Sequence, residues 1–263
     1  MKRLLLAVVL SLAFCQAAGA DTVDLITLVD LNRDVVNGNW QLVNGELIFD
    51  ATPSARISFP YHPPLEYDYT VEFTLTHGTD PWGNIAQLVS HGEVPFAWST
   101  NAGTGHYCRL EDINGHSVID NPTLIFYPFV AGQRYTSVVR VRNDRVICEI
   151  NGQILVEYET DYSDLSRNPQ WQMPDQLNLG LGGWNGPTTI HSATVTLPKP
   201  PPAVRGCIEV TGQPLFDIQV KLIQQGGKNQ ETLTDINGCY EFENVVPGRA
   251  FDIRITGPVF PVE

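Results

Sequence analysis

The chain has 263 residues and a formal net charge of −13, from 29 acidic and 16 basic side chains. A surface of this charge repels nucleic acid and anionic lipid, and it disfavours polyanionic ligands more than neutral or cationic ones. The length allows one or two domains. Beyond the first 20 residues, no stretch is long and apolar enough to predict a transmembrane helix.

The first 20 residues have the parts of a secretory signal. A short basic head precedes an apolar run over residues 4–14, and residues 18–20 form a cleavage site of the A-x-A type. Cys15 raises the alternative of a lipoprotein, but bulky Phe14 stands where a small residue is needed. We therefore expect residues 1–20 to be removed and the mature protein to be secreted, periplasmic or held at the cell surface.

Residues 21–197 are predicted to be strands almost throughout. Apolar and polar residues alternate along the run "YTVEFTLTHG", as in a strand with one buried face. Asn44-Gly45 and Asn151-Gly152 each separate two alternating runs, which is the strongest short-range signal for a β-hairpin. Many short strands with such turns predict an all-β fold, an antiparallel jelly-roll-like β-sandwich.

The segment "CRLEDINGH" (108–116) holds several residue types that are common in active sites. If it is a strand, Glu111 and Asp112 face opposite sides of the sheet. They cannot then flank one glycosidic bond, because an acid–base pair needs both carboxyls on the same side, about 5 to 9 Å apart. We interpret the segment as a strand with solvated charges that ends in a turn at Asn114-Gly115.

The segment "QLNLGLGGW" gives the candidate ligand site. Its leucines mark a buried face, so Asn178, Gly180, Gly182 and Trp184 fall on the other face. The two glycines leave backbone that another group can approach closely. The indole of Trp184 could stack on the apolar face of a sugar. The alternative is that Trp184 packs inward at a kinked strand end.

The other aromatic and acidic candidates carry weaker signals. Trp40 and Trp98 share strand faces with apolar residues and are expected in the core, whereas Trp82 lies in a turn-rich segment and is a possible rim contact. "DLNRD" (30–34) lacks the glycine and glutamate of a calcium loop, which favours a solvated turn. A looser calcium cage stays open, formed by Asp112, Asn114, Asp120 and Asn121.

Four segments in order resemble the concanavalin-A-like, laminin-G-like sandwich modules of exported bacterial proteins. They are "LVDLNRDVVNGNWQLVNGELIF", "YCRLEDINGHSVIDNPT", "VRVRNDRVICEINGQILVEY" and "LGLGGWNGPTTIHSATV". The resemblance implies a β-sandwich whose ligand contacts come from the concave sheet and the rim loops. Relatives include sugar-binding modules and sugar hydrolases, but this chain lacks the E-x-D-x-x-E carboxylate run of the related glucanases.

The proline-rich segment 198–202 predicts a stiff linker, and residues 203–263 predict a second, smaller β domain. The tail has the G-Q-P-L turn, the D-x-N-G-x-Y-x-F hairpin and the V-P-G turn. With these motifs it resembles carboxypeptidase-regulatory-like or collagen-adhesin B-type repeats, which are transthyretin/Ig-like sandwiches. That resemblance implies a stalk or spacer.

Four cysteines follow the signal, two in each predicted domain. An even number in an exported chain favours disulfides over catalytic thiols, so we expect the bridges Cys108–Cys148 and Cys207–Cys239.

The sequence therefore predicts an exported, non-catalytic recognition module for a carbohydrate or cell-surface glycan, with no cofactor. A glycoside-processing enzyme of the same fold and a structural or adhesion component of the cell surface are the alternatives. The sequence contains neither the histidine spacing of a metal site nor a G-x-S-x-G motif, and both absences count against a hydrolase of those types.

Overall fold

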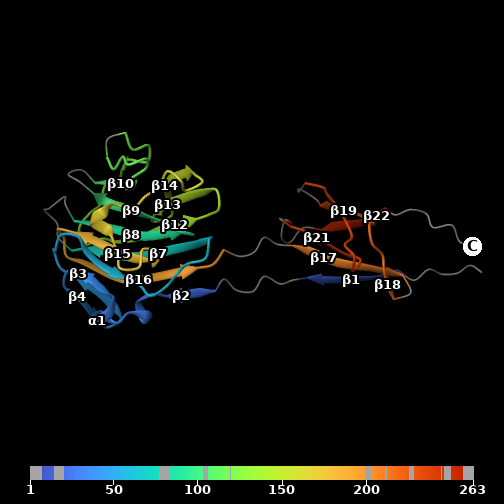
Figure 1. The fold of residues 1–263 in the computed structure, drawn as a ribbon, viewed down its shortest axis with the longest axis horizontal. Helices are drawn as coiled ribbons and strands as arrows, with labels where there is room; N and C mark the ends of the chain where they lie inside the picture. The colour runs from blue at the N-terminus through green and yellow to red at the C-terminus, as the bar shows by residue number, and fades with distance from the viewer. Residues whose placement is uncertain are drawn as a thin grey trace, which may run out of the picture. The chain divides into compact units, whose positions relative to one another are not determined.

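The computed structural model describes residues 8–14 (backbone only), 21–76, 83–102, 106–118, 120–198, 203–210, 212–224, 228–243, 245 and 250–256. The chain forms two compact units, residues 20–198 and residues 1–19 with 199–263. Both units consist of antiparallel strands (Figure 1), so the predicted all-β class is confirmed. Of the predicted linker, only Pro198 lies within the described residues.

The larger unit is a sandwich of an eight-stranded and a seven-stranded sheet. In spatial order the first contains β14 (Gln153–Glu159), β13 (Arg145–Ile150), β12 (Arg134–Val141), β7 (Tyr67–Leu75), β16 (Thr188–Thr196), β5 (Glu46–Phe49) and β4 (Trp40–Val43), with β2 (Thr22–Asp24) beside β16. The second contains β11 (Ile125–Phe126), β10 (Tyr107–Leu110), β9 (Val94–Ala102), β8 (Asn84–His91), β15 (Gly180–Trp184), β6 (Ala55–Ser58) and β3 (Val35–Asn37).

Both predicted hairpins are confirmed. Asn44 and Gly45 have φ angles of 53° and 85° and connect β4 to β5, and Asn151 and Gly152 have φ angles of 50° and 79° and connect β13 to β14. Two positive φ angles in succession define the turn that matches the twist of the adjoining strands. Asparagine and glycine therefore fix the register of both strand pairs.

The core lies between the two sheets. In β7 every second residue is buried, as expected for a strand with one solvated face. In contrast, all residues of β8 from Asn84 to Ser90 are buried, so both faces of this strand are covered. Trp98 is completely buried and Trp40 is 7% exposed, so both are core residues as predicted.

In the described ranges of the chain, helix is confined to single turns, η1 (Ile26–Leu28), α1 (Leu31–Asp34) and η2 (Pro169–Trp171). The "DLNRD" segment is a largely exposed turn before β3, as predicted, but it is helical and its last residue, Asp34, is buried. The Asp30 carboxylate accepts a hydrogen bond from the Asn32 backbone, and buried Asp34 accepts one from the Asp30 backbone. Within the described residues, no helix has the length and apolar character needed to span a bilayer.

The smaller unit contains two sheets with their own core. One consists of β1 (Val8–Phe14), β17 (Val204–Val210) and β18 (Gln213–Pro214), with β21 (Cys239–Phe242) also paired to β17; the other consists of β20 (Gln230–Leu233), β19 (Gln219–Gln224) and β22 (Phe251–Thr256). The predicted signal segment thus contributes a strand that pairs with β17 along its whole length. Its removal from the mature protein stays a prediction.

One of the two predicted disulfides is present. Cys207 and Cys239 lie opposite each other on β17 and β21 and are bonded. Cys108 and Cys148 are free thiols, so the second bridge is a correction to the sequence analysis. These two residues come from the facing sheets of the sandwich, where complete burial in the apolar core accounts for both side chains without a bond.

Candidate functional site

The outer face of the seven-stranded sheet carries a row of side chains across five neighbouring strands. The register places Arg56, Gly182, Ala86, Ser99 and Arg109 side by side, from β6 through β15, β8 and β9 to β10. With strands about 4.8 Å apart, the two arginines lie about 19 Å from each other. Between them is a strip of three small residues.

Trp171 of the same chain fills this strip. A Cβ atom on Gly182 would lie 2.5 Å from the Trp171 ring, and one on Gly180 would lie 2.7 Å from the Met173 sulfur. Both large side chains form one apolar cluster with Ala86 and Leu88 of β8 and Ala97 of β9. The expectation that Gly180 and Gly182 leave backbone bare for a ligand therefore needs correction, because the chain's own side chains make the close approach.

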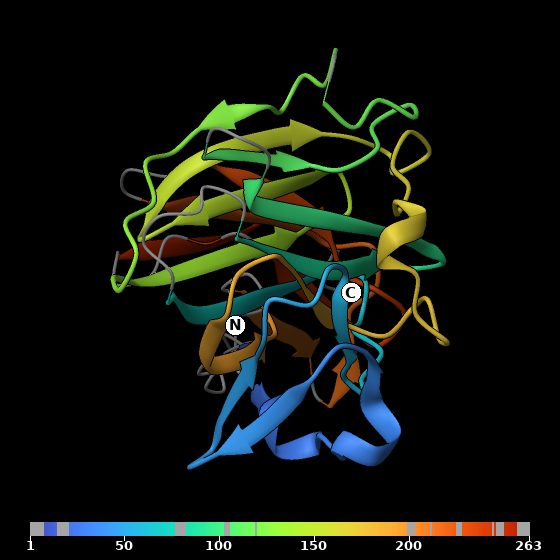
Figure 2. The same ribbon diagram turned by 90° about the vertical axis from the view of Figure 1, so that its left-hand side faces the viewer.

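Trp171 and Met173 belong to a covering segment (residues 167–176) that includes η2 and lies beside strands β8 and β9 (Figure 2). The buried Arg167 guanidinium anchors its start by donating to the Val89 carbonyl at 2.7 Å. Arg56 donates through Nη1 to the Gln170 carbonyl. The covering segment explains why both faces of β8 are buried.

Glu111 lies beneath the covering segment and is completely buried. It accepts hydrogen bonds from Ser99 Oγ at 2.5 Å and Trp171 Nε1 at 2.6 Å, and Arg109 Nη2 lies 3.3 Å from Oε1. Burial raises the pKa of this carboxyl above its ordinary value, although the Arg109 charge opposes the shift. The prediction of solvated charges in "CRLEDINGH" is wrong for Arg109, Glu111 and Asp112, which are all buried.

The predicted strand is confirmed over Tyr107–Leu110, but it ends before Glu111, and Ile113 joins the core together with Cys108 and Leu110. Cys108 and Leu110 face the core, whereas Glu111 belongs to the outer face. Asn114 and Gly115 have positive φ angles and form the predicted turn. The alternation thus predicted which residues of the strand face the core. It did not predict that the covering segment buries the charged residues on the outer face.

Among the residues that the structure describes, three polar side-chain atoms on the outer face are buried without a hydrogen-bond partner: Arg56 Nε, Asn84 Oδ1 and Arg109 Nε. They come from β6, β8 and β10, and Asn84 and Arg109 are each only 7% exposed. Nearly all buried polar groups in folded proteins have a partner. Several exceptions on one face mark a place where groups from outside the chain could complete the bonds.

Trp184 is partly exposed at the end of β15, opposite Asn84 and diagonal to Arg56. Its ring meets the Trp171 ring edge to face, with centroids 6.5 Å apart, and its strand partner is Asn84. We call Trp184, Arg56 and Asn84 the open-end cluster. Asn178 precedes β15 and donates to Ser58 Oγ, whereas Trp82 lies outside the described residues.

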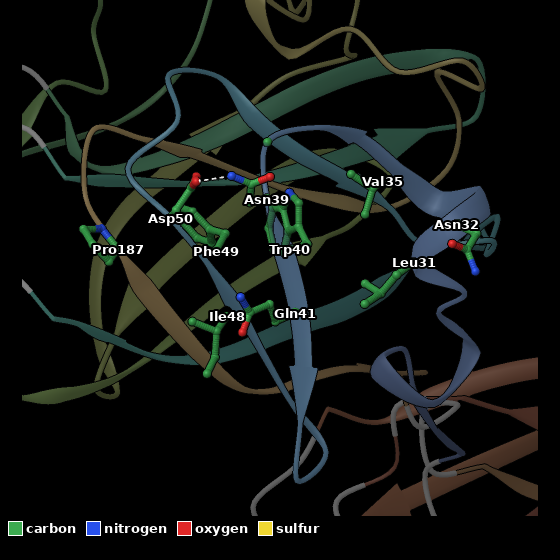
Figure 3. A pocket seen from close by; sticks show the side chains of 11 residues that line it. Leu31, Asn32, Val35, Asn39, Trp40, Gln41, Ile48, Phe49, Asp50 and Pro187 are labelled. Carbon is green, nitrogen blue, oxygen red and sulfur yellow. Dashed lines mark hydrogen bonds between the residues drawn. The ribbon is translucent and has the colours of Figure 1, made fainter.

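A pocket of about 660 Å³ lies at the edge strand β4 and shares no residue with the open-end cluster (Figure 3). Trp40 and Phe49 line it, but the Trp40 ring is 7% exposed and donates through Nε1 to the Asn37 carbonyl. Asn39 donates to Asp50 (dashed in Figure 3), whose pKa is lowered mainly by its bond from Thr52. Little ring surface is therefore free there.

One residue of the calcium hypothesis, Asn121, is engaged within the protein. Asn121 organises its loop, because its amide donates to the Leu110 carbonyl and its Oδ1 accepts from Thr123. In the part of the chain that the structure describes, no three His, Cys, Asp or Glu side chains are grouped to hold a metal ion.

Sequence reasoning missed Trp171, Arg56 and Asn84. Arg56 and Asn84 occupy outward positions of their strands, a signal that the alternation rule could have used. The position of Trp171 has no comparable signal, because it depends on the path of an irregular segment.

No protein-family model matches the sequence, and no curated protein matches it either. Among solved structures, the carbohydrate-binding module CBM66 from Bacillus subtilis is similar with 13% sequence identity and a TM-score of 0.46, over 62% of this chain and 93% of that one. A protein of unknown function with a galectin-like fold from Bacillus subtilis is similar with 13% identity and a TM-score of 0.47, over 69% and 97% of the two chains.

The Crh5 transglycosylase in complex with NAG is similar with 15% identity and a TM-score of 0.46, over 76% of this chain and 96% of that one. With TM-scores below 0.5, these comparisons carry no argument about activity. The two sheets described above establish the fold, an antiparallel β-sandwich, as the resemblance implied.

Proposed function

We propose that the larger unit is a non-catalytic carbohydrate-recognition module of an exported protein, and that the open-end cluster is its ligand site. The observation that carries the proposal is the outer face of the seven-stranded sheet. There a partly exposed tryptophan adjoins buried polar side chains with atoms that no group of the protein satisfies.

This combination suits the chemistry of a sugar. A pyranose ring has an apolar C–H face that can lie on the Trp184 indole, while its hydroxyls at the ring edge both donate and accept hydrogen bonds. Asn84 Oδ1 has no partner within the protein and could accept from such a hydroxyl. Because this atom is buried, a ligand reaches it only if the side chains around it move.

A glycoside-processing enzyme is the second candidate, and one observation favours it. Burial raises the pKa of Glu111, as is typical of a carboxyl that acts as a general acid. Against catalysis, this side chain is completely buried and accepts hydrogen bonds from Ser99 and Trp171. The hydrolytic mechanism also needs a second carboxyl facing the same bond.

Export and a stalk-like role of the smaller unit complete the proposal. The disulfide Cys207–Cys239 supports an oxidising location outside the cytoplasm. The turn motifs of the tail support a spacer domain. The predicted domain has 61 residues and buries little apolar surface, so a covalent bond between two of its strands suits a domain of this size.

A glycan array and a hydrolysis assay with residues 21–263 test the proposal. We expect the protein to bind a subset of glycans and to release no reducing ends from them. Release of sugar that disappears in Glu111→Gln, with the fold retained, would favour the enzyme instead. Absence of binding and hydrolysis on all glycans would favour a structural component.

A further inference from the structure

We propose that the ligand of the open-end cluster is a sugar that carries an anionic group, a carboxylate or a sulfate ester, and that Arg56 binds this group. The inference rests on the proposed function and specifies its substrate class. Two observations support it: the Arg56 guanidinium lacks a full set of partners within the protein, and Arg56 lies beside Trp184.

Arg56 differs from the other arginines of the larger unit. Among the described residues of that unit, six arginines have a carboxylate within 4.0 Å: Arg33, Arg109, Arg134, Arg140, Arg142 and Arg145. Arg167 has none, but its three guanidinium nitrogens donate to the Phe96 and Val89 carbonyls and to Gln176. Arg56 has neither a carboxylate nor a complete set of acceptors.

The Arg56 guanidinium uses only part of its hydrogen-bonding capacity. Nη1 donates to the Gln170 carbonyl, Nε is buried without an acceptor, and Nη2 is neither bonded nor among the buried unpartnered atoms. Nη2 is therefore accessible from outside. Burial lowers the pKa of this side chain, with no carboxylate close enough to oppose the shift. An unpaired, partly desolvated cation is costly, and an anion from a ligand would offset that cost.

The position of Arg56 fits one sugar residue with Trp184. Arg56 lies opposite Gly182, and Trp184 follows two residues later on the same face of β15. Diagonal neighbours of this kind on antiparallel strands have Cβ atoms about 7–8 Å apart. A ring stacked on Trp184 would thus present a substituent to the guanidinium, whose planar fork matches the oxygens of a carboxylate or sulfate. Asn84 would accept from a hydroxyl on the other side.

The net charge of −13 limits the number of anionic groups in the ligand. Repulsion by distant acidic residues is screened beyond about 8 Å at physiological salt, whereas Arg56 acts at contact distance. A net charge of this size disfavours polyanions but is compatible with a glycan that bears a single acidic sugar. We expect such a glycan to bind more tightly than a polyanion of the same sugar.

The test uses residues 21–263 on an array of glycans in matched forms: neutral, carboxylated, carboxyl methyl-esterified and sulfated. We expect binding to the anionic forms, with at least a tenfold loss on methyl esterification. Binding to carboxylated but not sulfated forms identifies a uronic acid, and the reverse identifies a sulfate ester. Because esterification changes only the ligand, this arm does not depend on the folding of a variant.

Arg56→Gln should weaken binding of the anionic forms at least tenfold, and Arg56→Lys should restore part of it. Arg134→Gln is the matched control, since that arginine is 58% exposed and pairs with Glu72 on the other sheet. Equal binding of neutral and anionic forms, or binding unaffected by Arg56→Gln, would overturn this inference and leave carbohydrate recognition intact. Binding of no glycan would overturn both.

Discussion

The two faces of the seven-stranded sheet both bury polar atoms, but they differ in whether these atoms have hydrogen-bond partners. On the inner face, several buried polar side chains are partnered: Gln87 donates to the Tyr69 carbonyl and accepts from Ser137, which also accepts from the Trp98 ring nitrogen. His91 at the end of β8 is an exception, because its Nε2 is buried without a partner and its ring stacks on Tyr162. On the outer face, Arg56 Nε and Asn84 Oδ1 are equally hidden from water but have no partner. The inner face is optimised for folding alone, whereas the outer face retains groups that a ligand could satisfy.

The largest expected effect is on the inner face. Trp98→Ala should lower the free energy of unfolding by about 4 kcal/mol, because a completely buried indole leaves a cavity. Urea denaturation of residues 21–263 measures this loss. Leu42→Ala is the control, since Leu42 is 44% exposed and should change stability by less than about 0.5 kcal/mol. A cost below about 1 kcal/mol for Trp98→Ala would mean that this face is not the core.

On the outer face, removal of a tryptophan ring should lower the free energy of unfolding by less. Trp171→Ala should lower the free energy of unfolding by about 3 kcal/mol, because the covering segment can settle into the space that the ring vacates. Trp171→Phe should cost about 1–2 kcal/mol, since it keeps a ring but removes the donor to Glu111. The same denaturation experiment measures both. If Trp171→Ala cost more than Trp98→Ala, the two faces would not differ as described.

Glu111 makes the outer face sensitive to pH. Its pKa is raised by burial, so the folded state holds this proton more tightly than the unfolded chain. The stabilising contribution is complete below the ordinary value of 4.5 and is lost as the pH rises through the raised folded value. Glu111→Gln has no charge at either pH. Its stability relative to the wild type should therefore rise from about pH 4 to about pH 7, and a flat difference would contradict the assignment.

The sequence predicted the fold better than the site, for a physical reason. Alternation and the Asn-Gly turns are local signals, and they gave the strands, the two hairpins and the core positions of Trp40 and Trp98. The same alternation placed Glu111 on the outer face and Cys108 on the inner one. These predictions required only that a strand points successive side chains to opposite sides.

The errors all concern groups that meet from distant parts of the chain. Gly180 and Gly182 were expected to be open, and Glu111 solvated, because nothing local shows that residues 167–176 fold over them. Likewise, an even number of cysteines shows that bridges are chemically reasonable but not which thiols meet. Burial of a polar face depends on the path of an irregular segment, which carries no periodic signal.

The reactivity of the two free thiols, Cys108 and Cys148, tests whether the inner face excludes solvent and reagents. Burial raises the pKa of Cys108 to about 12 and that of Cys148 well above its ordinary value. Neither should react with a thiol reagent in the native protein at about pH 8, and two thiols should react after denaturation without reductant. Cys207 and Cys239 should react only after reduction. If the denatured protein contained no free thiol, the predicted Cys108–Cys148 bridge would be reinstated.

The most direct test of the central claim is the affinity of Trp184→Ala for a glycan that the array identifies. Loss of one stacking ring should cost about 1–3 kcal/mol, on the scale known for aromatic stacking on bases, which is about a ten- to hundredfold weaker affinity. The melting temperature should change little, because Trp184 is only partly buried at a strand end. Titration calorimetry of the variant beside the wild type measures this. Unchanged affinity with an intact fold would contradict the assignment of the site to the open-end cluster.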